Sequence, residues 1–210
     1  TQDVFGHGTH CIGTSCGPKT PVSPVVRYGI AYGAQIFAGK VLNNNGGGTD
    51  GQILAGINWA YGQGCSIISM SLGGASAGAG FSQVFEATAA NLLNNGTLIV
   101  AAAGNDSNRP GTIRPVSHPA NCPSIMAVGA VDENMNMAYF SNGGLFPAYG
   151  AVDIVGPGAA VFSALSTPHS IRMGPAGIIH GNCNGTSMAT PHVAGIAALW
   201  HQATGLRGRA

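Results

Sequence analysis

Short runs of apolar residues, each about the length of a buried strand, recur along the chain. A run of this kind that is bounded by turn residues predicts a strand inside a folded core. We therefore expect these segments to form a central sheet. They lie at residues 34–41, 65–72, 98–103, 125–131 and 152–155.

Two segments between these runs have helical spacing instead. Apolar residues recur every three to four positions in segment 50–61, where Asp50 is the expected N-cap. Segment 81–93 is followed by Asn-Asn-Gly, which is typical of a helix C-terminus. Alternating strands and helices indicate parallel pairing with right-handed crossovers. The predicted fold class is α/β, with a central, mostly parallel sheet flanked by helices.

The stretch GTSMATPHVAG, residues 185–195, combines a small, flexible start with an apolar helix that continues through Trp200. Ser187 is therefore predicted at a helix N-terminus, where unpaired N–H groups and the helix dipole stabilise negative charge. Pro191 is expected in the first helical turn, which needs no donor from it. An isolated serine in this position is alternatively a simple N-cap. The rest of the chain decides between these two roles.

A nucleophilic serine needs a base for its proton and a donor for the oxyanion. Glycines flank His7 in the segment GHGTHC, which leaves its imidazole unobstructed where a helix can begin. Asn105 follows the apolar run 98–103, so its amide is expected at the exit of a buried strand. We therefore predict that His7 is the base and Asn105 the oxyanion donor for Ser187.

Composition narrows the classes of function. Only 7% of the 210 residues are charged and the formal net charge is +1, which leaves no basic face for nucleic acid. No apolar stretch reaches a membrane span and no signal peptide opens the chain, so we interpret its start as mature or trimmed. We expect residues 1–210 to form one domain. The 5 cysteines are an odd number, so they cannot all pair within the chain. A disulfide between Cys122 and Cys183 is possible, but the sequence does not establish it.

Four blocks, GHGTHC, SMSLGG, AAAGND and GTSMATPHVAG, resemble in this order the signatures of the subtilisin-like serine peptidases. Cys11 and the run 149–158 make the chain most similar to the proteinase K branch. The resemblance implies a three-layer subtilisin-like fold and a secreted, monomeric endopeptidase that acts on peptides or proteins. It also implies that Ser187 attacks the peptide carbonyl, that His7 transfers the proton, and that Asn105 and the Ser187 N–H hold the oxyanion.

By the same resemblance, two edges of a cleft pair with the backbone of an extended substrate. A plain flexible loop is the alternative for the first edge, which is the glycine segment. Walls of alanine and glycine leave the first specificity pocket roomy, so we expect a preference for apolar or aromatic side chains. The expected substrate-binding residues are Gly46, Gly47, Gly48, Ser71, Leu72, Gly73, Ala102, Ala103 and Gly104.

The acid that orients the histidine has no counterpart at the expected place. The family takes it from an earlier strand, in an Asp-Ser/Thr-Gly context, and in the order Asp, His, Ser. No such tripeptide occurs in the sequence, and Asp3 lies outside that context. We therefore expect an incomplete fold that lacks the N-terminal strand with this aspartate, and we leave open whether the C-terminal end is complete.

One cation site is implied by the resemblance to the proteinase K branch. Asp153 matches a calcium-binding aspartate, and Pro123 and Ile125 match two positions that offer backbone carbonyls. Hard oxygen ligands of this kind suit calcium. Asp153 alternatively caps a turn. His10 lies three residues after the predicted base, but no third metal ligand is visible, so we assign it a structural role.

Three alternative functions remain to be weighed. A truncated or degenerate protein of this fold would bind peptide in the cleft and scarcely hydrolyse it. A transpeptidase or cyclase would share the acyl-enzyme and differ only in the acceptor. A nucleotide-binding domain is poorly supported, because the glycines form neither a strand-linked G-x-G-x-x-G nor a P-loop. Segment 163–181 is predicted as an extended loop of unassigned role.

Overall fold

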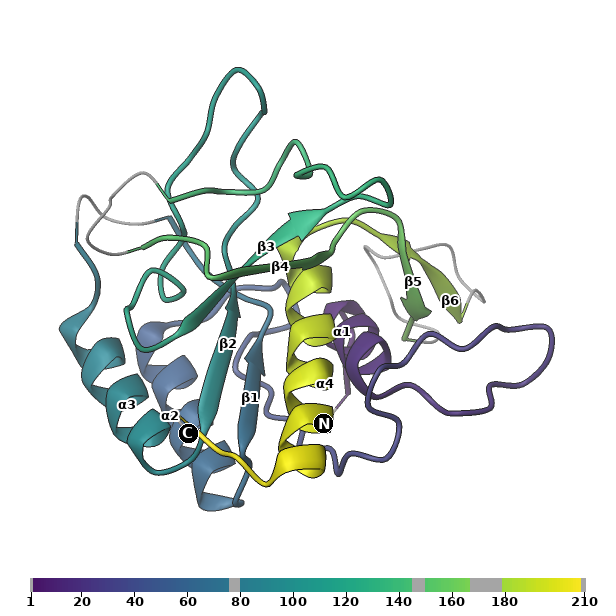
Figure 1. Ribbon diagram of the computed structural model, residues 1–210, viewed down its shortest axis with the longest axis horizontal. Coiled ribbons are helices and arrows are strands. Elements are labelled where there is room, and N and C mark those ends of the chain that lie inside the picture. Colours follow the sequence, from purple (N-terminus) through teal and green to yellow (C-terminus); the bar gives the residue numbers. More distant parts are fainter. Residues whose placement is uncertain (1, 76–79, 145–149, 167–178, 209–210) are drawn as a thin grey trace.

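The computed structural model describes residues 2–75, 80–144, 150–166 and 179–208 (Figure 1). Within these ranges one parallel sheet has the strand order β1-β2-β3-β4, so chain order and spatial order agree. Its strands are β1 (Ile67–Met70), β2 (Leu98–Ala102), β3 (Met126–Val131) and β4 (Ile154–Pro157). The helices are α1 (His7–Cys16), α2 (Asp50–Gly62), α3 (Gln83–Asn94) and α4 (Thr186–Thr204).

Alternate residues of β2 face two separate hydrophobic clusters. Ile99 and Ala101 lie in a cluster with Phe85 and other side chains of α2 and α3. Val100 lies in a second cluster with Val193 of α4. Because successive side chains of a strand point to opposite faces, helices cover both faces of the sheet (Figure 1). The predicted α/β fold with a central parallel sheet between helices is confirmed.

A second, two-stranded sheet was not expected. It is antiparallel and consists of β5 (Val161–Ala164) and β6 (His180–Cys183), so segment 163–181 is wrongly predicted as a loop at both ends. Residues 167–178 lie outside the described part of the chain. The completely buried His10 of α1 contacts this sheet, since its Nε2 lies 3.1 Å from the Val161 carbonyl and 3.2 Å from the Gly181 carbonyl.

The apolar run 34–41 forms no strand, which corrects the prediction. Ile36 and Phe37 are 48% and 37% exposed, and the Phe37 ring packs edge-on against Trp59 of α2. A strand needs a hydrogen-bonded neighbour, and no strand among the described residues pairs with this run. The apolar pattern of this segment therefore predicted a buried strand, but the segment has no neighbouring strand among the described residues that would pair with it and bury it.

The ends of the two predicted helices are set by local hydrogen bonds. α2 is capped by Thr49 and not by Asp50, because the Thr49 hydroxyl accepts from Gln52 N while the Gln52 side chain accepts from Thr49 N. This reciprocal pair is a capping box, and it moves the cap by one residue. α3 ends as expected, with Gly96 at a φ of 85° beyond its last turn.

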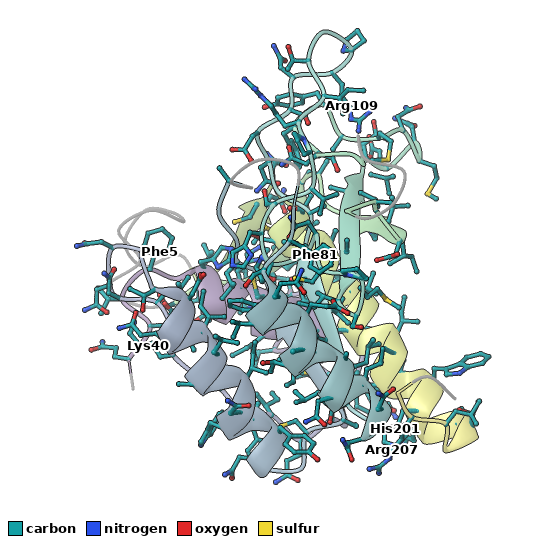
Figure 2. The ribbon with its side chains drawn as sticks, turned by 90° about the vertical axis from the view of Figure 1, so that its left-hand side faces the viewer. Phe5, Lys40, Phe81, Arg109, His201 and Arg207 are labelled. Carbon is teal, nitrogen blue, oxygen red and sulfur yellow. The ribbon has the colours of Figure 1, made fainter. Side chains whose placement is uncertain are left out.

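The far end of α4 is tied to the start of β1. Arg207 Nε donates to His201 Nε2 at 2.7 Å, and Figure 2 shows these two side chains together at that end of the molecule. Since Nε2 accepts, the ring proton is on Nδ1, which donates to the Ser66 hydroxyl at 3.0 Å.

None of the helices in the described ranges is long and apolar enough to cross a membrane. All five cysteines are free thiols, so Cys122 and Cys183 are not bonded to each other.

Candidate active site

Ser187 is the second residue of α4. The N-cap is Gly185, which has a φ of 150° and provides no side-chain cap. The prediction of a helix N-terminus is therefore confirmed, whereas the alternative of a serine N-cap is wrong. Thr186 N and Met188 N both have acceptors, but the described residues offer none for the Ser187 N–H. This N–H is free to bind an oxyanion.

Pro191 lies in the second turn of α4 and not in the first, which corrects the prediction. It lacks the N–H that would bond the Ser187 carbonyl four residues before it. That carbonyl accepts from the Ser71 hydroxyl at 2.7 Å and from the Cys11 thiol at 3.4 Å instead. The proline thereby frees the carbonyl of Ser187 for contacts with residues beyond β1 and on α1.

His7 is the first residue of α1, and Asp3 anchors the start of this helix. The Asp3 carboxylate accepts from Gly6 N at 2.9 Å, from Thr9 N at 2.7 Å and from the Thr9 hydroxyl at 2.8 Å. Burial raises the pKa of Asp3, but these hydrogen bonds outweigh it and leave the pKa lowered. Both oxygens of Asp3 are therefore engaged with the helix start rather than with the His7 ring.

A cysteine separates the predicted base from the predicted nucleophile. The Cys11 sulfur lies 3.9 Å from each ring nitrogen of His7 and contacts the Ser187 carbonyl. Burial raises the pKa of this thiol to about 12, so it stays neutral and fills space. The Ser187 hydroxyl donates to the Ser71 carbonyl at 3.5 Å, and the described residues show no hydrogen bond from it to His7. Such catalytic bonds often tighten only when substrate binds.

Asn105 follows β2 and is held against the start of α4. Its Oδ1 accepts from Thr186 N at 2.8 Å and from the Thr186 hydroxyl at 3.0 Å. The same hydroxyl accepts from Gly104 N at 3.1 Å. Because Oδ1 already accepts two hydrogen bonds, the amide nitrogen of Asn105 is the group that can donate to an oxyanion.

One open cleft of about 1510 Å³ contains the predicted site. Ala103 does not line it, because this residue is completely buried and its N–H and carbonyl bond Val128 and Ser117. The other predicted residues lie along the cleft: His7, Asn105, Ser187, Gly46, Gly47, Gly48, Ser71, Leu72, Gly73, Ala102 and Gly104.

The two predicted substrate edges differ in how open they are. No hydrogen bond of the Leu72 or Gly73 backbone is seen among the described residues, so this edge can pair with a peptide. The glycine segment is partly closed on itself, since Asn43 N donates to the Gly47 carbonyl and Gly46 N to the Asn43 carbonyl.

The three predicted calcium ligands lie where parallel strands begin. Asp153 directly precedes β4, and Pro123 and Ile125 precede β3, its neighbour in the sheet. Asp153 Oδ2 accepts from Ala127 N at 2.7 Å, which turns the carboxylate toward this edge and leaves Oδ1 for another partner. The described residues contain no group of three or more His, Cys, Asp or Glu that could hold a metal.

Sequence reasoning did not single out Thr186. Its side chain is completely buried and joins the Asn105 amide to the Gly104 backbone. The available signal was its place directly before Ser187 in the block GTSMATPHVAG.

Removing the Ser71 hydroxyl tests the anchor of the Ser187 carbonyl. We expect Ser71→Ala to lower kcat/KM about tenfold, because only the weaker Cys11 donor then remains. The matched control is Ser69→Ala, two residues earlier on β1 with an exposed side chain, which we expect to leave kcat/KM unchanged. Equal losses in the two variants would contradict the anchoring role.

Two known proteins are similar to this chain in sequence over most of its length. Subtilisin DY from Bacillus licheniformis is 38% identical over 197 residues, which cover 94% of this chain and 64% of that protein. Subtilisin Savinase from Lederbergia lenta is 39% identical over 203 residues, which cover 96% of this chain and 65% of that protein. This chain therefore spans slightly less than two thirds of the length of these two relatives.

Solved structures agree with these relatives. Sphericase superposes with a TM-score of 0.79 at 31% identity, covering 99% of this chain and 67% of that one. A cold adapted subtilisin-like serine proteinase gives a TM-score of 0.73 at 31% identity, covering 99% of this chain and 64% of that one. The sequence matches the Subtilase family over residues 1–206, and the chain therefore belongs to this family.

Proposed function

We propose that this chain hydrolyses peptide bonds as a serine endopeptidase, with Ser187 as nucleophile and His7 as base. One observation supports this proposal most strongly. The Ser187 N–H lacks an acceptor among the described residues, at the start of a helix against which the Asn105 amide is held. Two donors that converge beside one hydroxyl are what an oxyanion requires.

The proposed reaction has two halves. His7 takes the Ser187 proton as the hydroxyl attacks the peptide carbonyl, and the oxyanion is bound by the Asn105 amide and the Ser187 N–H. The intermediate collapses as His7 protonates the leaving amine, and water then hydrolyses the acyl-enzyme. Because Asp3 is engaged with α1, the acid that orients His7 is proposed to be a different group.

We place the chain nearest the proteinase K branch within the family. Cys11 supports this proposal, since its neutral thiol occupies the space between His7 and the Ser187 carbonyl. For the substrate, we propose an extended peptide that pairs with Leu72 and Gly73 and places an apolar or aromatic side chain against Ala102 and Gly104. The protein is further proposed to act as a secreted monomer.

A serine-directed probe tests the proposed function. The chain is incubated with a fluorophosphonate and, separately, with a fluorogenic peptide that carries an aromatic residue before the scissile bond. We expect labelling and turnover in the wild type and in Ser23→Ala, a matched variant at an exposed serine, and neither in Ser187→Ala. A folded wild-type chain that binds peptide but is not labelled would contradict the proposal and favour a peptide-binding protein.

Product analysis separates hydrolysis from acyl transfer. The two reactions share the acyl-enzyme, so only the acceptor distinguishes them. Free carboxylic acid products support the proposed peptidase, whereas ligated or cyclised peptides support a transpeptidase.

The pH dependence of kcat/KM follows from the surroundings of His7. Burial, with a smaller contribution from His10, lowers the pKa of His7 below 6.5, and Asp3 only partly opposes this. The base must be neutral, so activity is lost when pH falls through this lowered pKa. For the described residues alone, without the further acid proposed to orient His7, we expect an acid limb with its midpoint below 6.5. A midpoint above 6.5 would mean that a carboxylate outside the described residues faces His7.

We propose a structural calcium ion held by Asp153 Oδ1 and the carbonyls of Pro123 and Ile125. Oδ1 has no hydrogen bond among the described residues, and all three donors are hard oxygens at one edge of the sheet. Calcium bound there would link the starts of β3 and β4, and water would complete the six to eight ligands it takes.

Calcium is expected to stabilise the folded chain. At about 100 times the dissociation constant it should add about 2.7 kcal/mol and raise Tm by roughly 5–10 °C. Asp153→Asn keeps an acceptor for Ala127 N but removes the charge, so the shift should disappear. The control is Asp132→Asn, on the exposed turn after β3, which should respond like the wild type. An unchanged shift in Asp153→Asn, measured by calorimetry, would contradict this site.

A further inference from the structure

We propose that Asn142 is a positioning residue for the Asn105 amide, an inference that rests on the proposed function. Asn142 is 1% exposed, follows β3 in the chain, and does not line the cleft. It therefore cannot contact substrate, and any effect on catalysis must pass through other residues.

The side chain of Asn142 holds the residue that follows Asn105. Its Oδ1 accepts from Asp106 N at 2.9 Å and from the Ser107 hydroxyl at 3.0 Å. Its Nδ2 donates to Asp106 Oδ2 at 3.1 Å and to the Ser117 hydroxyl at 3.3 Å. One buried amide thus uses both its acceptor and its donors to hold this turn and to join it to Ser117.

The backbone of Asn142 holds the residue that precedes Asn105. Its N–H donates to the Gly104 carbonyl at 3.0 Å, at a glycine with a φ of 104°. Asn105 is itself exposed, so packing does not fix it. Its backbone is instead held on both sides by Asn142.

The orientation of the Asn105 amide follows from this backbone position. With Oδ1 bonded to Thr186, the Nδ2 atom lies next to Gly185, at the helix end where the oxyanion is proposed to form. A turn that is free to relax would misplace this donor relative to the Ser187 N–H. Small displacements of a preorganised donor are costly for catalysis.

The substitution Asn142→Asp tests the assignment with a side chain of the same shape. It removes the two Nδ2 donations and places a second carboxylate beside Asp106. We expect kcat to fall by about ten- to a hundredfold with KM nearly unchanged, because the lost interaction belongs to the transition state. The matched control is Asn121→Asp, at a buried asparagine outside the cleft lining, which should keep its kcat.

A double-mutant cycle identifies the residue through which Asn142 acts. In an Asn105→Ala background the donor is already gone, so adding Asn142→Asp should not lower kcat further. If Asn142→Asp does not fold at the assay temperature, Ser107→Ala removes one contact to its Oδ1, together with the acceptor of Arg114 N, and should give a smaller loss in the same direction.

The outcomes separate this inference from the proposed function. Independent losses that multiply in the double mutant, or a change in KM alone, would overturn the positioning role while the peptidase stands. A folded wild-type chain that neither turns over peptide nor reacts with the fluorophosphonate would overturn the proposed function, and the role of Asn142 with it.

Discussion

With the acid proposed to orient His7 in place, the substitution His7→Ala is expected to lower kcat about 10⁶-fold, the loss known for the related subtilisin when its histidine or serine is removed. The substitution removes the imidazole at the start of α1 that is proposed to take the Ser187 proton. KM should change little, since His7 does not belong to the edges that pair with substrate. Steady-state kinetics with a fluorogenic peptide provide the measurement.

The control for this prediction is a histidine on the helix of the nucleophile. The ring of His192 bonds the Met188 carbonyl at 2.8 Å and does not line the cleft. We expect His192→Ala to cost stability but to keep kcat close to that of the wild type. With the acid proposed to orient His7 in place, a loss of less than about a hundredfold in His7→Ala would show that His7 is not the base.

The largest expected loss of stability comes from Gly104→Ala. Gly104 has a φ of 104°, which side chains rarely adopt, and an added Cβ would overlap Ser117 Oγ and Asn142 Nδ2. These two neighbours are 4% and 1% exposed and cannot move into solvent. Backbone strain and overpacking together should cost about 3 kcal/mol and lower Tm by roughly 6–12 °C.

A second glycine provides the comparison for this measurement. Gly51 lies in the first turn of α2, and an added Cβ there would meet no atom within 4 Å. Gly51→Ala should therefore be neutral or stabilise the chain by up to about 1 kcal/mol, as expected for alanine in a helix. Similar melting temperatures for the two variants would contradict the argument for Gly104.

Much of the central fold could be predicted because its signals are local. The run that became β2 is apolar throughout, and the Asn-Asn-Gly after α3 stops a helix wherever it occurs. Segment 34–41 has an equally apolar pattern but lacks a hydrogen-bonded strand beside it in the described chain. Whether a segment is buried depends on the residues that pack around it, and the sequence of the segment alone does not show which residues those are.

The missed strands show the opposite case. β6 has the sequence HGNC, which carries no strand pattern, and it pairs with β5 only through contacts distant in sequence. His10 is similar, because its partners are two carbonyls contributed by these strands. Pairing of this kind depends on which distant segments the fold brings side by side, and the periodicity of apolar residues does not show that.

For the candidate site, the residues proposed to take part in the reaction could be predicted from the sequence. The residues that hold them in position could not. Ser187, His7 and Asn105 stand in short motifs with glycines and helix starts that suggest their chemistry. The contacts of Asn142 with the turn around Asn105 join segments that follow two different strands. No spacing in the sequence indicates that a buried amide after β3 belongs to a turn after β2.

Pro191 determines how the site can move. A regular helix would bond the Ser187 carbonyl internally, and α4 could then shift as a separate rod. Because this carbonyl is bonded to Ser71 and Cys11, displacement of α4 strains the end of β1 and α1 as well. The nucleophile, the helix of the base and one substrate edge should therefore fluctuate as one rigid body. We then expect motions that admit substrate to arise elsewhere, and among the described residues the exposed glycine segment 46–48, which also lines the cleft, is one place for them.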